Sequence, residues 1–226
     1  MDVELPGQTP ARPRGVLNEI YPAGAPAASD PWLFYSVSRL GLDYRDFFDR
    51  DLGTSYSQAL VSAAAKKSAS GALGEAAVRE LRLAALLDPD VPDAPLYEGF
   101  YFSSRGDWAS ARSSFKASAD IYERLLKLSG EYYSLPSLRQ GLASSSAYAW
   151  LNYGVALEKS GDRQCAESAY LLAAGRNPRL ADPHYNLAIL YWNRDWSKVR
   201  AELEETLRLN PLHAQAAGYL RQIRGR

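Results

Sequence analysis

The 226 residues balance 26 Lys and Arg against 26 Asp and Glu, so the formal net charge at pH 7 is zero. A balanced chain has no long-range field that would attract a phosphate backbone or an anionic membrane, which excludes nucleic acid as a general partner. Hydrophobic residues make up 46% of the sequence, enough for a continuous core. No window approaches the roughly 18–20 apolar residues of a membrane span, so no direct membrane insertion is expected.

The cysteine content and the first residues bear on the cellular compartment. Cys165 is the only cysteine, which excludes an internal disulfide and agrees with a reducing compartment. Residues 1–10 lack the apolar run of a secretory signal. If Met1 is the native start, we expect a cytoplasmic protein. If the sequence is excised from a larger protein, a periplasmic or other extracytoplasmic location fits equally well.

Residues 1–29 are rich in proline, which opposes any regular element longer than a turn. We predict an extended leader. Part of it is expected to lie along the rest of the chain through the apolar patch formed by Val16, Leu17, Ile20 and Tyr21. The alternative is a disordered leader, because such a composition buries little apolar surface.

Helical signals begin at about residue 30. A polar cap before Pro31 is typical of a helix start, and this helix would end at Gly41. Asp43 begins a second helix, in which Gly53 predicts a kink or an interruption. These two segments are expected as additional helices ahead of a longer array.

Residues 147–178 show a regular spacing of small and aromatic side chains. Counted from Trp150, Gly154 comes four residues later, Ala166 sixteen and Tyr170 twenty. These positions form two apolar stripes at helical spacing, separated by a glycine turn. The small residues would let two helices approach closely while the rings fill the space beside them. One such hairpin cannot bury both of its faces, so the pattern predicts stacked neighbours.

The same spacing recurs, with Gly99 and Phe115 at the places of Gly154 and Tyr170. Asn177 with Pro178 recurs as Asn210 with Pro211, which gives a period of roughly 33–34 residues. This pattern resembles the tetratricopeptide repeat. The resemblance implies an all-α fold: a right-handed α-α superhelix of about four hairpins, with extra N-terminal helices and a C-terminal capping helix. The expected parts are the leader at 1–29, the array at 30–226, hairpins at about 55–89, 92–127, 147–178 and 181–211, and the capping helix at 212–224.

The interval between the second and third hairpins is longer than one period. Gly99 and Gly154 are 55 residues apart, about 21 more than the repeat requires. We assign the excess to an insert at 128–144, whose glycines and proline predict a loop. Its tyrosines and leucines offer a surface for self-association.

Catalysis has little support in this sequence. His184 and His213 fall in different expected helices, without a Cys or carboxylate at metal-ligand spacing, and we expect His184 to be packed. Cys165, beside Ala166, is interpreted as a small packed or half-exposed side chain and not as a nucleophile. No phosphate-binding glycine loop occurs. We therefore expect no enzyme, no catalytic residue, no metal and no cofactor.

The resemblance implies a binding function instead. In tetratricopeptide-repeat proteins the first helix of each hairpin lines the concave face, where partner peptides commonly lie. Carried onto this sequence, the expected partner-binding residues are Tyr97, Phe100, Tyr148, Asn152, Val155, Tyr185, Asn186, Ile189 and Trp192. The same face is expected to include Leu96, Leu151 and Asn193.

Two observations refine the expected ligand. Asn152 and Asn186 are 34 residues apart, and their amides could hold a peptide backbone or bond only within the array. The Lys and Arg set with which chaperone-binding relatives hold a terminal carboxylate is missing from the groove, so an acidic C-terminal motif is not expected there. Aromatic side chains favour an apolar or aromatic partner.

The sequence therefore predicts a non-catalytic interaction module that holds a peptide or a partner helix in its groove, with a protein or peptide as its partner. The alternative is a soluble repeat segment of a larger envelope or membrane-associated protein, acting as an assembly scaffold.

Overall fold

The computed structural model describes residues 11–14, 17–20, 47–132 and 136–223. The chain divides into two compact units, residues 1–97 and 98–226. The helix predicted to run from Pro31 to Gly41 lies outside the described residues.

The leader contains a short antiparallel hairpin. Strands β1 (Ala11–Arg14) and β2 (Leu17–Ile20) pair with Ala11 opposite Ile20 and Arg14 opposite Leu17. The sequence predicted no regular element here, and this part of the prediction is wrong. A proline is compatible with such a ladder because each strand of a two-stranded sheet has one edge that needs no hydrogen-bond partner.

The first unit contains α1 (Phe47–Ala69), α2 (Glu75–Leu87) and the start of α3 (Asp93–Ser104). Gly71, with φ of +70°, lies in the turn between α1 and α2. Their contact buries Leu60 and Leu81, and the Lys67 ammonium lies 2.7 Å from a Glu80 carboxylate oxygen. Helix α1 continues through Gly53 without the predicted interruption. A glycine costs a helix only about 1 kcal/mol, which packing elsewhere along the helix can offset.

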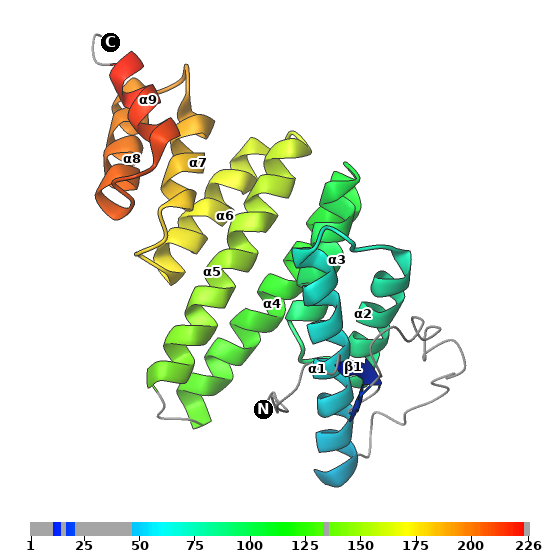
Figure 1. The fold of residues 1–226 in the computed structure, drawn as a ribbon. Helices are drawn as coiled ribbons and strands as arrows, with labels where there is room; N and C mark the ends of the chain where they lie inside the picture. The colour runs from blue at the N-terminus through cyan, green and yellow to red at the C-terminus, as the bar shows by residue number, and fades with distance from the viewer. Residues whose placement is uncertain (1–10, 15–16, 21–46, 133–135, 224–226) are drawn as a thin grey trace. The chain divides into compact units, whose positions relative to one another are not determined.

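The second unit continues as a succession of helices, each packed against the next from α4 to α9 (Figure 1). The helices are α4 (Trp108–Tyr132), α5 (Pro136–Lys159), α6 (Arg163–Arg176), α7 (Asp182–Tyr191), α8 (Trp196–Leu209) and α9 (Ala214–Gln222). The predicted all-α hairpin fold is confirmed. The short α9 takes the place of the predicted capping helix.

The insert at 128–144 is helical where it is described, so the predicted loop is wrong. Helix α4 extends to Tyr132 and α5 begins at Pro136. Proline is well placed there, because the first residue of a helix needs no intrahelical N–H bond. The two long helices pack against each other, and Ser129 near the end of α4 is buried. This tertiary contact outweighs the local helix-breaking tendency of the glycines.

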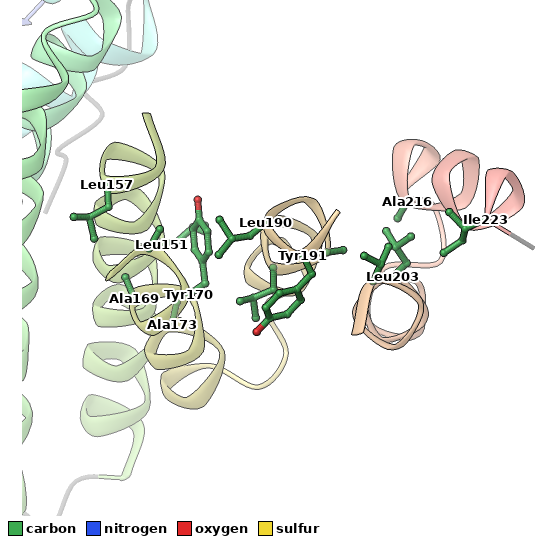
Figure 2. Close-up of a cluster of buried hydrophobic side chains, with 14 residues drawn as sticks. Leu151, Leu157, Ala169, Tyr170, Ala173, Leu190, Tyr191, Leu203, Ala216 and Ile223 are labelled. Atoms are coloured by element: carbon green, nitrogen blue, oxygen red, sulfur yellow. The ribbon is translucent and has the colours of Figure 1, made fainter. Parts of the chain in front are cut away.

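The core of the second unit is built around Tyr170. Figure 2 shows its ring between Leu151 and Leu157 of α5 and Leu190 of α7. The ring is fully buried, and its hydroxyl donates to a Glu158 carboxylate oxygen at 2.9 Å. Burial of the ring is the main cause that raises the pKa of this hydroxyl, and Glu158 adds to it. The core thus joins consecutive hairpins through an aromatic side chain whose polar end is satisfied.

Candidate functional site

The second helix of each hairpin in the second unit starts at a capping aspartate. One carboxylate oxygen of each accepts a hydrogen bond at 3.1 Å from the backbone N–H three residues later. The aspartates are Asp107, Asp162 and Asp195. These caps satisfy N–H groups that a helix start leaves without partners. They also fix the residue at which each second helix begins.

The predicted residues of α5 lie on a stripe beside the buried one. Tyr148 is 46% exposed, whereas Leu151 and Gly154 on the neighbouring stripe are buried. Asn152 and Val155 are half-buried. The Tyr148 ring lies 6.1 Å from the ring of Phe100 on α3, centroid to centroid. The structure therefore brings together Phe100 and Tyr148 from these two first helices.

The two asparagines differ in their hydrogen bonds. The Asn152 side-chain amide donates to the Tyr148 carbonyl oxygen at 2.8 Å, so part of it is engaged within its own helix. Asn186, one repeat later on α7, is half-buried and forms no side-chain hydrogen bond to any described residue. Of the two amides, that of Asn186 has more of its donors and acceptors available to a ligand.

The predicted residues of α7 lie against the C-terminal helix. The Tyr185 ring stacks on the Tyr219 ring, with their centroids 6.3 Å apart. The centroid of the Trp192 ring lies 5.1 Å from that of the same Tyr219 ring. Burial raises the pKa of the Tyr185 hydroxyl, and Tyr219 adds to this. Ile189 is half-buried on the same helix. Part of each ring surface is thus already used inside the array.

We use the name ring-lined face for the predicted partner-binding residues that belong to the second unit. They are Phe100, Tyr148, Asn152, Val155, Tyr185, Asn186, Ile189 and Trp192.

Tyr219 and His213 join this face although the sequence analysis did not include them. His213 caps α9 by accepting from the Ala216 N–H, and its ring lies 4.6 Å from that of Tyr185. Tyr219 comes 34 residues after Tyr185, which is one repeat period. This spacing would have identified Tyr219 if the C-terminal capping helix had been treated as the first helix of a further hairpin.

Comparisons with known proteins bear on the fold. No protein-family model and no curated protein matches the sequence. Two crystal structures of MamA superpose with TM-scores of 0.55 and 0.53, at 20% and 21% identity. They cover 74% and 71% of this chain, and 80% and 81% of their own chains. YrrB, described as a tetratricopeptide-repeat protein with an unusual peptide-binding site, aligns at 19% identity over 73% of this chain and 92% of its own, with a TM-score of 0.32.

The chain has the tetratricopeptide-repeat fold. With identities of 20% and 21%, the likeness to MamA is one of fold. Across the described ranges, no helix of the repeat array has both the length and the apolar character needed to cross a membrane.

The structure places three of the residues predicted to line the groove of the repeat array elsewhere. Leu96 and Leu151 are 7% and 6% exposed, and Leu151 belongs to the core cluster of the second unit. Asn193 is exposed, but it lies in the turn after α7 with φ of 62°. Asparagine tolerates this left-handed conformation better than most residues, which explains its presence there. Tyr97 is half-buried and packs against the core of the first unit.

Cys165 and His184, two of the side chains considered for catalysis, both lie within the repeat array. Cys165 is exposed, not packed or half-exposed as predicted. A hydrogen bond to Asp162 is the main cause that raises the pKa of its thiol, which disfavours the reactive thiolate. His184 is half-buried, and its Nδ1 lies 2.7 Å from a Glu202 carboxylate oxygen. No group of three or more His, Cys, Asp or Glu that could hold a metal occurs among the described side chains.

Proposed function

We propose that this chain is a non-catalytic interaction module whose ring-lined face binds a peptide or partner helix bearing apolar or aromatic side chains. The observation that carries the proposal is the exposure of Tyr148. This ring is 46% exposed beside Phe100, although both lie next to a fully packed stripe. A rigid ring provides a large contact area and loses little conformational entropy on binding.

The polar residues of the face support the same ligand class. The amide of Asn186 can both donate to and accept from a peptide backbone. None of the eight residues that define the ring-lined face is charged, which favours an apolar ligand over an ionic one. A groove of this kind is expected to bind a short peptide with a Kd of about 1–100 μM.

The test is a selection of displayed peptides on the purified chain, followed by fluorescence anisotropy with the selected peptides. We expect Tyr148→Ala to weaken binding by about tenfold, as for a ring at the centre of an interface. The matched control is Leu171→Ala on α6, which removes a side chain that is 51% exposed on a second helix and outside the ring-lined face. Its affinity should be unchanged.

Trp192→Ala is a less direct test, because Trp192 also packs on Tyr219 and on Trp196, the latter at 5.2 Å. Circular dichroism and thermal unfolding must accompany that variant. The proposal fails if Tyr148→Ala and Leu171→Ala behave alike, or if the selected peptides bind Tyr148→Ala and the wild type equally.

A further inference from the structure

An open cavity of about 440 Å³ lies at the hairpin turns of the second unit. Its lining residues are Gly161, Arg163, Gln164, Glu167 and Arg194. The first four come from the α5–α6 turn and the start of α6, and Arg194 comes from the turn between α7 and α8. None of them belongs to the ring-lined face, so this is a separate feature of the surface.

Two of the five lining residues are arginines, Arg163 and Arg194. Nη2 of Arg163 donates to the Leu190 carbonyl oxygen at 2.7 Å, which holds its side chain across α6 and α7. One such bond leaves further N–H groups of the five that an arginine carries. The Arg194 side chain is exposed and forms no hydrogen bond or ion pair within the described ranges. Neither guanidinium is ion-paired with a described carboxylate.

The nearby carboxylates are engaged elsewhere. One oxygen of Glu167 accepts from the Tyr191 hydroxyl at 2.8 Å. Asp162 and Asp195 accept from backbone N–H groups as helix caps. Nζ of Lys198 lies 4.8 Å from the centroid of the Tyr191 ring, whose hydroxyl donates to Glu167. The cavity therefore presents two arginines, with one carboxylate among its lining residues.

We propose that this cavity binds one oxyanionic side chain of a partner polypeptide, held by Arg194 and Arg163. The ligand chemistry is a carboxylate or a phosphate monoester, since a guanidinium fork matches both with paired, charge-assisted hydrogen bonds. The exposed amide of Gln164 provides a further donor. The cavity is open to solvent, so a side chain on the surface of a partner can enter it.

This inference goes beyond the proposed function, because it concerns the turn edge of the hairpins and requires no ligand on the ring-lined face. The groove lacks the Lys and Arg set that would hold a terminal carboxylate. The proposal is compatible with this, because the cavity lies at other positions. Arg163 and Arg194 are 31 residues apart in sequence, and the stacking of consecutive hairpins places both at one cavity.

The test is a titration of the ¹⁵N-labelled chain, followed by backbone amide NMR signals of Gly161, Gln164 and Arg194. The probes are N-acetyl-O-phosphoserine amide and N-acetylglutamate amide, with N-acetylglutamine amide as the uncharged comparison. We expect saturable shifts at these three signals with at least one anionic probe and none with the uncharged one. Arg194→Gln should weaken binding by about tenfold, the usual effect of losing a charge-assisted pair.

The matched control is Arg179→Gln, an exposed arginine in the α6–α7 turn that does not line the cavity. It should bind like the wild type. Saturation by the phosphoserine probe alone assigns the cavity to phosphorylated partners, and saturation by the glutamate probe alone assigns it to acidic ones. Arg194→Gln removes a lining guanidinium without breaking a described hydrogen bond, so it should remain folded. Equal affinities for wild type and Arg194→Gln, or no saturable shift with either anion, would overturn the proposal.

Discussion

The ring of Tyr170 occupies the space that a side chain at Gly154 would need. A methyl group placed on Gly154 would lie 2.5 Å from Cε1 and 2.6 Å from Cδ1 of that ring. The preceding hairpin repeats this relationship, because a methyl group on Gly99 would lie 2.5 Å from Cδ1 of Phe115. Each glycine and ring therefore form one packing unit between the two helices of a hairpin.

We expect Gly154→Ala to lower the free energy of unfolding by about 1–3 kcal/mol, because the added methyl group would overlap the fully buried ring of Tyr170. Urea unfolding followed by circular dichroism measures the change. The control is Gly141→Ala in the same helix, where an added methyl group meets no atom within 4 Å. That variant should be about 0.5–1 kcal/mol more stable than the wild type, since alanine favours a helix. Equal destabilisation of both variants would contradict the packing explanation.

Glu123 of α4 links three helices through its carboxylate. One oxygen accepts from Ser146 Oγ at 2.7 Å, Trp150 Nε1 at 3.0 Å and Arg176 Nε at 2.9 Å, and the other accepts from Nη2 of Arg176. Burial is the largest single influence and acts to raise the pKa of Glu123. The hydrogen bonds from Arg176, Ser146 and Trp150 together outweigh it, so the pKa is lowered.

A pKa lowered in the folded state means that the ionised Glu123 stabilises the fold above its unfolded pKa, taken as 4.5. This contribution is lost as the pH falls through the folded pKa. We expect Glu123→Gln to be less stable than the wild type near neutral pH by about 1–3 kcal/mol. The difference should shrink in urea unfolding at increasingly acid pH. Glu204→Gln, an exposed change on α8, is the control. A difference that is constant with pH would show that the charge of Glu123 is not responsible.

Asp162 both caps α6 and influences Cys165. Asp162→Ala should cost about 1 kcal/mol of stability through loss of the cap. It should also lower the pKa of the Cys165 thiol, because the hydrogen bond to Asp162 is the main cause that raises it. More thiolate then forms at a given pH, and the reaction with a disulfide reagent such as DTNB becomes faster.

Asp195→Ala separates the two effects. Asp195 caps α8 through the Lys198 N–H and has no described contact with the thiol, so this variant should lose similar stability without any change in the thiol rate. If both aspartate variants speed the reaction equally, general loosening of the fold is the cause and the specific role of Asp162 is excluded.

Self-association through residues 128–144 stays a prediction, and the structure provides a direct test. Leu128 on α4 and Leu138 on α5 are 38% and 44% exposed. We expect Leu128→Gln with Leu138→Gln to shift sedimentation velocity profiles toward the monomer, because exposed apolar side chains contribute to association by burial. Leu171→Gln with Leu172→Gln on α6 is the control, since both leucines are similarly exposed outside the segment. If the α6 variant dissociates the protein instead, the contact lies elsewhere.

Local spacing was sufficient to predict most hairpins of this chain. The first hairpin was predicted at about residues 55–89, and its second helix is observed inside that range at Glu75–Leu87. Such agreement arises because helical periodicity, caps and glycine turns all act within a few residues. The insert was predicted wrongly for the same reason, since its glycines and proline are local signals. The packing of α4 on α5, which keeps the segment helical, is not local.

By itself the sequence determined where paired helices approach closely, because the spacing of glycine, alanine and ring side chains decides how near two helices can come. Only the tertiary structure decided which side chains from different hairpins meet. It placed Tyr219 against Tyr185 and Trp192, and Arg194 at the same cavity as Arg163. These contacts depend on how far one hairpin turns and shifts relative to the next, which is set by the packed core as a whole and not by the spacing of residues within any single hairpin.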